Sequence, residues 1–124
     1  IIDKSIIEVA QGDISKTKKF GFKSKGTIDN TQKLFILELL TQVSDENELM
    51  KIAVNIIAKF RFTSEIAPEI LDNLFYKNAP AIVFPYIRAY VSSLTALSGI
   101  ETIILPTINM ESIAEELKEN TNLI

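Results

Sequence analysis

The chain has 124 residues, of which 47% are hydrophobic and 23% charged, and its formal net charge is −3. These values are typical of a globular protein, and we expect one domain over residues 1–124. The sequence contains no Cys, His or Trp, which excludes disulfides, thiolate metal sites and catalytic groups built on Cys or His. The weak negative charge argues against nucleic acid as a partner.

No targeting or membrane-spanning segment is expected. The first ten residues include Asp3, Lys4 and Glu8 and lack the long apolar run of a signal peptide. The most apolar window, 79–97, is interrupted by Arg88 and falls short of the ~20 predominantly apolar residues that a membrane span needs. A chain without Cys suits a reducing compartment, so we expect a cytoplasmic protein with no membrane insertion.

Two extended segments are expected near the N-terminus. Residues 4–10 predict a short strand, and residues 14–28 predict a second one in which Phe20 and Phe22 share a face. Five lysines crowd this second segment: Lys16, Lys18, Lys19, Lys23 and Lys25. They are typical of a solvent-exposed edge strand, and the alternative is a patch that binds anions.

The next two segments predict a β-hairpin. Residues 32–43 carry apolar side chains on both faces, so a helix can cover one face and another subunit or a ligand must cover the other. Residues 48–62 alternate with a period of two, which predicts an antiparallel strand with one solvated face. The polar residues 44–47 predict a connecting loop of four or five residues.

Helices are expected in the rest of the chain. Residues 69–77 predict a short helix or crossover, which Asn78-Ala79-Pro80 ends. Apolar residues at helical spacing predict a long helix over 81–98. Residues 100–109 are expected to be extended, and residues 110–120 predict a last helix. Strands first and helices last indicate an α+β fold.

Few residues point to catalysis. The four glycines form no phosphate-binding loop. Glu38 lies among leucines, and burial there would raise the pKa of its carboxyl group, although the favoured interpretation is a carboxylate that reaches solvent or pairs with a lysine. The glutamates of 110–120 form a solvated face, or alternatively a landing site for a basic partner. We therefore expect no enzyme activity, no cofactor and no metal.

The sequence carries more apolar surface than a monomer of this length needs. Residues 32–43 are apolar on both faces, and Phe84, Tyr86 and Tyr90 spread around the expected long helix rather than along one stripe. We expect this excess to close a homo-oligomer or to line a groove for apolar ligands.

A specific motif lies in the segment 80–109. It consists of Phe84, Pro85, Tyr86 and Arg88, followed by a Ser-Ser pair, Gly99, and then Leu105, Pro106 and Asn109. With these residues the segment resembles the SecB family of protein-export chaperones, whose helix opens with a Phe-Pro-Tyr-x-Arg signature. The resemblance covers about a quarter of the chain, and the order of the preceding strands agrees with it.

The resemblance implies a fold, a function and an assembly. The implied fold is a four-stranded antiparallel sheet with a long helix and a C-terminal helix packed on one face. The implied assembly is a homotetramer, built as a dimer of dimers. The implied function is that of an ATP-independent chaperone, or holdase, which binds unfolded or precursor polypeptides in apolar grooves and delivers them to the motor ATPase of the translocase.

Positions in this implied fold suggest two sets of site residues. The residues expected to line the peptide-binding groove are Leu71, Leu74, Phe75, Tyr76, Phe84, Tyr86, Leu37 and Leu39. The residues expected at the oligomer interface are Ile87, Tyr90, Val91 and Leu94.

The sequence departs from the family in its charge. Family members are usually strongly acidic and dock the motor through a carboxylate-rich sheet face, whereas Lys51, Lys59 and Arg61 are expected on the outward face here. This departure leaves open a SecB-like chaperone of a toxin–antitoxin system. Two further alternatives are a small-ligand binder or enzyme of α+β type, such as a hot-dog thioesterase, and an inert structural oligomer.

Overall fold

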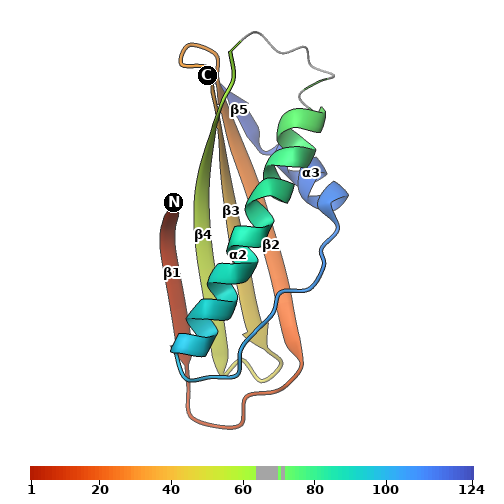
Figure 1. The fold of residues 1–124 in the computed structure, drawn as a ribbon. Coiled ribbons are helices and arrows are strands. Elements are labelled where there is room, and N and C mark those ends of the chain that lie inside the picture. The colour runs from red at the N-terminus through yellow and green to blue at the C-terminus, as the bar shows by residue number, and fades with distance from the viewer. Residues whose placement is uncertain (64–69, 71) are drawn as a thin grey trace.

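The computed structural model describes residues 1–63, 70 and 72–124, with the backbone alone for residues 72–74. In these residues one sheet contains five strands: β1 (Ile2–Val9), β2 (Lys18–Asp29), β3 (Leu34–Asp45), β4 (Met50–Arg61) and β5 (Thr121–Leu123). Their order across the sheet is β1-β4-β3-β2-β5. Neighbouring strands are antiparallel except β5, which runs parallel to β2 (Figure 1).

The described helices follow the first four strands, as expected for an α+β chain. A π-helical turn, η1 (Asp72–Lys77), runs directly into α2 (Asn78–Leu97), and α3 (Met110–Glu119) follows an irregular segment. The expected break at 78–80 is wrong, because the helical path of η1 continues into α2 through Asn78, Ala79 and Pro80. Of the expected helix over 69–77, residues 69 and 71 lie outside the described part of the chain.

The fifth strand corrects the expected four-stranded antiparallel sheet. After α3 the chain returns to β2, where the N–H of Gly26 donates to the carbonyl of Asn120 at 3.2 Å. The N–H of Ile124 then donates to the carbonyl of Ile28 at 2.9 Å. A three-residue strand has no detectable period of its own. It forms because α3 ends beside β2. Its pairing therefore depends on how α3 packs, and the sequence pattern of residues 121–123 does not reveal it.

The predicted hairpin of β3 and β4 is confirmed, with residues 46–49 between the strands. The fully buried Asp45 holds its turn. Its carboxylate accepts hydrogen bonds from the backbone N–H groups of Leu49 (2.7 Å), Met50 (3.0 Å) and Ser15 (2.9 Å). Burial alone raises the pKa of this carboxyl group, but the backbone donors outweigh burial and the pKa is lowered.

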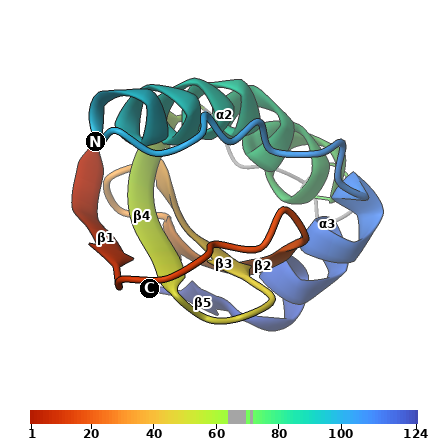
Figure 2. The same cartoon turned by 90° about the horizontal axis from the view of Figure 1, so that it is seen from below.

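Both helices lie on the same side of the curved sheet, with α3 toward its β2 edge (Figure 2). The core between the layers is built from alternate residues of β3 and β4, such as Leu37, Leu39 and Val54, against Ile87 and Val91 of α2. The opposite face of the sheet, which we call the outward face, carries no helix in the views of Figures 1 and 2. The second cover expected for β3 is therefore not supplied by the described elements of this chain.

Candidate functional site

Three of the residues expected in the groove lie in the core of the single chain. Leu37 and Leu39 have no exposed surface, and Phe84 is 6% exposed. All three pack in the layer between α2 and the sheet. Tyr86, by contrast, is 70% exposed on α2. Within one chain, Tyr86 is thus the member of this group that offers a large surface to a ligand.

The expected crossover residues also pack inward where they are described. The ring of Phe75 stacks on that of Phe35 with 4.4 Å between their centroids. Tyr76 is buried and meets Phe35 edge to face. Leu71 and the side chain of Leu74 lie outside the described part of the chain.

The residues expected at the oligomer interface divide in the same way. Ile87 and Val91 have no exposed surface and belong to the core. Tyr90 and Leu94 are half-buried. The hydroxyl groups of Tyr90 and Ser5 are hydrogen-bonded at 2.7 Å, which ties α2 to the edge strand β1. A contact with another chain through these positions would have to use Tyr90 and Leu94.

An apolar groove lies along the open edge of β2, and we call it the β2-edge groove. It has a volume of about 350 Å³ and is lined by Phe20, Phe22, Pro106, Ile108, Asn109, Ser112, Ile113 and Glu116. Phe22 forms part of its wall and meets Phe84 of α2 edge to face at 6.0 Å. The fold thus brings β2, the irregular segment 100–109 and α3 together around one hollow.

The backbone beside this groove is open to a further strand. β5 covers β2 only at Gly26–Ile28, so Lys18–Lys25 has a neighbouring strand on one side alone. Because the N–H of Gly26 points toward β5, the alternation of an antiparallel ladder turns the backbone groups of Phe20 and Phe22 to the same open edge. These groups make no hydrogen bond to another described residue on that side. An extended peptide can therefore pair with this edge and place side chains in the groove.

The sequence contained a signal for this groove. Phe20 and Phe22 alternate on one face of a strand whose other positions are rich in lysine. A polar strand with two neighbouring phenylalanines is typical of an edge beside an apolar surface. The partners of that surface, Pro106 and Ile108, are some 85 residues away along the chain, so the sequence did not reveal them.

A second apolar surface runs along the solvent side of α2. Its exposed residues are Ala81, Ile82, Pro85, Tyr86, Ala89, Ser93, Ala96 and Leu97, which we call the α2 stripe. The 20 residues of α2 contain one charged side chain, Arg88, which lies over the ring of Phe84 at 5.2 Å. A hollow of about 520 Å³ opens beside the stripe, between Tyr86 and the exposed ends of β1 and β4. The solvent side of a helix normally carries charges, so this face has the character of a contact surface.

Glu38 lies on the outward face and forms an ion pair with Lys25 at 2.9 Å. Its side chain is 29% exposed, so the favoured interpretation, a carboxylate paired with a lysine, is confirmed. No group of His, Cys, Asp or Glu residues in the described part of the chain is arranged to hold a metal ion. Among the helices described here, none is long and apolar enough to cross a membrane.

Comparison with solved structures identifies the fold. The chain is similar to the SecB-like chaperone Rv1957 of Mycobacterium tuberculosis, solved in complex with a ChAD peptide from the HigA1 antitoxin. The TM-score is 0.73 with 16% sequence identity, over 88% of this chain and 83% of the other. The SecB-like fold expected from the Phe84–Arg88 motif is therefore confirmed.

Comparison with curated sequences is less informative. Over 48 residues the chain is 48% identical to an uncharacterised protein of Methanocaldococcus jannaschii. This match covers 36% of the chain and 31% of that relative, so the chain spans about a third of the length of the curated protein that it matches. No family model matches the chain.

Proposed function

We propose that this protein is an ATP-independent chaperone that holds unfolded polypeptides along the β2-edge groove. The observation that carries the proposal is the combination of an open backbone edge at Phe20 and Phe22 with an apolar hollow directly beside it. A client segment that pairs with this edge gains main-chain hydrogen bonds whatever its sequence is. Burial of its apolar side chains adds about 25 cal/mol per Å², again without recognition of a particular sequence.

The SecB-like fold supports this proposal. The solved neighbour from Mycobacterium tuberculosis is a SecB-like chaperone bound to a peptide. Holding a client by such contacts needs no chemical step, so we expect neither a cofactor nor enzyme activity. Groove residues expected from the sequence, Tyr86 above all, would extend the contact where they remain exposed.

Two client classes fit this proposal. Precursor polypeptides bound for export, with delivery to the motor ATPase of the translocase, are the first class. Antitoxins of a toxin–antitoxin pair are the second, and the neighbour's antitoxin peptide supports it. The basic side chains of Lys51, Lys59 and Arg61 on the outward face also support the second class, because the family docks its motor through a carboxylate-rich sheet face.

The assembly proposed for the chaperone is a homotetramer that uses the α2 stripe. Small residues at the centre of the stripe, Ala89 and Ser93, would let two antiparallel helices approach closely. An antiparallel pair centred on Ala89 would bring Ile82 of one helix opposite Ala96 of the other, and Leu97 opposite Ala81, so large residues meet small ones and the surface is complementary to itself. Tyr90 and Leu94, at the border of the stripe, would contribute to the same contact.

A matched pair of variants tests the chaperone proposal. Phe20→Asp places a charge in the β2-edge groove, whereas Leu123→Asp makes the same kind of change at an exposed residue of β5 that does not line the groove. Light scattering of a refolding client, without nucleotide, measures the activity. We expect wild type and Leu123→Asp to suppress aggregation at stoichiometric ratios and Phe20→Asp to lose most of the suppression. If the two variants are equally active, clients do not bind in the β2-edge groove. If the wild type does not suppress aggregation, the protein is not a chaperone of this kind.

A further inference from the structure

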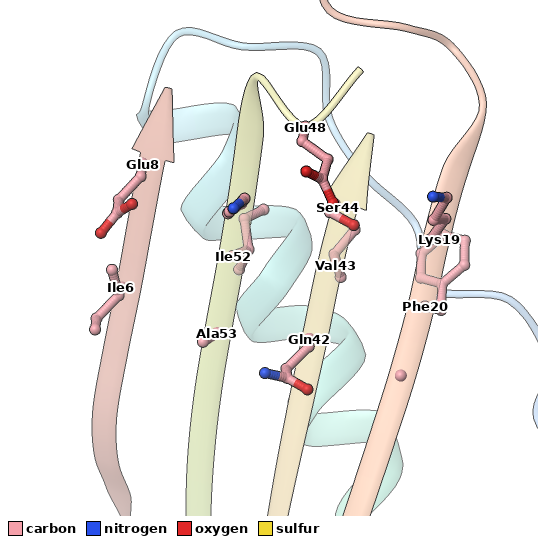
Figure 3. A pocket seen from close by; sticks show the side chains of 12 residues that line it. Ile6, Glu8, Lys19, Phe20, Gln42, Val43, Ser44, Glu48, Ile52 and Ala53 are labelled. Carbon is pink, nitrogen blue, oxygen red and sulfur yellow. The ribbon is translucent and has the colours of Figure 1, made fainter. Parts of the chain in front are cut away.

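The outward face of the sheet contains a trough near the β3–β4 turn (Figure 3). Figure 3 looks onto this face with α2 behind the strands. The register aligns Ile6, Ala53, Gln42 and Gly21 in one row across β1, β4, β3 and β2. Ala53 is small and Gly21 has no side chain, so this row forms a floor between two rows of longer side chains. The trough has a volume of about 500 Å³.

Lysines lie on both sides of the trough, although only Lys19 and Lys51 line it. The row toward the turn contains Lys51 and Lys19, with Glu8 at its end, and the next row away from the turn contains Lys4 and Lys23. All four lysines are exposed. Within the described part of the chain none of them forms an ion pair, in contrast to Lys25 on the same face. The charged residues that line the trough itself are two lysines, Lys19 and Lys51, and two glutamates, Glu8 and Glu48, so the positive excess comes from the surrounding outward face, including Lys4 and Lys23.

The net charge of the outward face also differs in sign from that of the rest of the chain. Its strand positions carry seven basic residues: Lys4, Lys19, Lys23, Lys25, Lys51, Lys59 and Arg61. They carry four acidic residues: Asp3, Glu8, Asp29 and Glu38. The whole chain has 13 basic and 16 acidic residues, so positive charge is concentrated on this one face. A concentrated field on one face selects partners of the opposite sign.

We propose that this trough docks an acidic polypeptide segment with an apolar side chain at its centre. The apolar side chain would lie on the floor over Ala53 and Gly21, between Ile6 and the edge of Phe20. Carboxylates before and after it would reach Lys51 and Lys19. The four strands of the row span about 14 Å at the usual spacing between strands, which an extended segment of four or five residues covers.

The local chemistry favours a polypeptide over nucleic acid. Glu8 and Glu48 line the same trough, and they would face the continuous phosphates of a nucleic acid strand. The floor presents no aromatic ring face on which a base could stack, since Ala53, Gln42 and Gly21 form it. Glu8 is the register neighbour of Lys51, so either partner would meet negative charge, but a peptide brings only a few discrete carboxylates whereas a nucleic acid strand brings a continuous row of phosphates.

This docking surface and the proposed client site share one residue, Phe20, which lines both. Otherwise the trough lies on the outward face, whereas the β2-edge groove lies on the side of the sheet that carries the helices. Lys51 and Gly21 line the trough and not the groove, so substitutions of these two residues are expected to weaken peptide binding and to leave client binding unchanged. Because Phe20→Asp would change both sites, the variants at Lys51 and Gly21 are the ones that let the two proposals fail separately.

Binding is measured by the anisotropy of a fluorescein-labelled peptide in which acidic residues flank one leucine. Lys51→Glu tests the trough, and Lys59→Glu is its matched control, because both lysines lie on the outward face of β4 and only Lys51 borders the trough. We expect Lys51→Glu to weaken binding about tenfold and Lys59→Glu to weaken it less than about threefold. Equal effects of the two variants would mean diffuse charge attraction and would overturn the trough.

Gly21→Val separates docking from folding. A Cβ at Gly21 meets nothing closer than the side-chain oxygen of Gln42 at 3.9 Å, so valine fits the strand and fills the trough. We expect unchanged or higher stability and at least tenfold weaker peptide binding, with suppression of client aggregation retained. If this variant binds the peptide as the wild type does, or if a peptide with serine in place of leucine binds equally well, the peptide's apolar side chain does not lie over Ala53 and Gly21. Tighter binding of single-stranded DNA than of the acidic peptide would overturn the choice of partner.

Discussion

Gly26→Ala tests whether α3 and β5 pack on β2 as the structure describes, which is the contact that builds one wall of the β2-edge groove. A Cβ at Gly26 would lie 2.9 Å from the hydroxyl oxygen of Thr121, 3.1 Å from Cε2 of Phe35 and 3.2 Å from Cδ1 of Leu117. Phe35 and Leu117 have no exposed surface, so neither side chain has free space to move into.

The magnitude follows from two opposing terms. Overpacking a well-packed core costs about 1–3 kcal/mol. Replacing glycine by alanine returns about 0.4–1 kcal/mol, because the unfolded chain loses conformational freedom. We therefore expect Gly26→Ala to lower the free energy of unfolding by about 1–2 kcal/mol, which corresponds to a fall in Tm of roughly 3–10 °C for a domain of this size.

Urea unfolding followed by circular dichroism measures this change, with Gly21→Ala as the control. Gly21 lies on the same strand, but its added Cβ meets only ordinary contacts, so its substitution is expected to be neutral or stabilising. The variant Thr121→Ala removes the nearest clashing atom, so Gly26→Ala should cost less in that background. If Gly26→Ala and Gly21→Ala shift the midpoint equally, α3 and β5 do not pack on β2 in this way.

Three further changes have defined outcomes. Asp45→Asn should destabilise the chain at neutral pH. The folded state lowers the pKa of Asp45, so the ionised carboxylate stabilises the fold fully above about pH 4, the ordinary pKa of Asp, and this stabilisation is lost as the pH falls below that value. The urea unfolding curves of the variant and the wild type should therefore converge in acid. Thr41→Val should stabilise by about 1 kcal/mol in urea unfolding, because the buried Thr41 hydroxyl lacks a hydrogen-bond partner among the described residues; a loss of stability would contradict this. Ile87→Ala should cost about 2–5 kcal/mol as a core deletion, whereas Ala89→Glu should spare the fold and reduce the native mass measured by sedimentation; the reverse result would contradict the proposed interface.

The division between core and contact surface on α2 shows where sequence reasoning stops. Helical spacing correctly predicted a long helix, and it marked Ile87 and Val91 as apolar positions. Spacing alone does not say whether an apolar position faces its own sheet or another chain. The structure turns Ile87 and Val91 into the core and leaves Ile82, Tyr86 and Ala89 outside, because the crossing of α2 over the sheet fixes the rotation of the helix.

The sequence by itself determined the strands β1 to β4, the hairpin around residues 46–49, the long helix and, through the Phe84–Arg88 motif, the SecB-like fold. These features are local: a period of two, a period of 3.6 and a short signature are all written in neighbouring residues. Only the tertiary structure decided the rest. The pairing of β5 with β2, the meeting of Phe22 with Ile108 in one groove, and the alignment of Ala53 with Gly21 on the floor of the trough each join residues far apart in the chain. Strand register and helix docking create such contacts, and no local pattern encodes them.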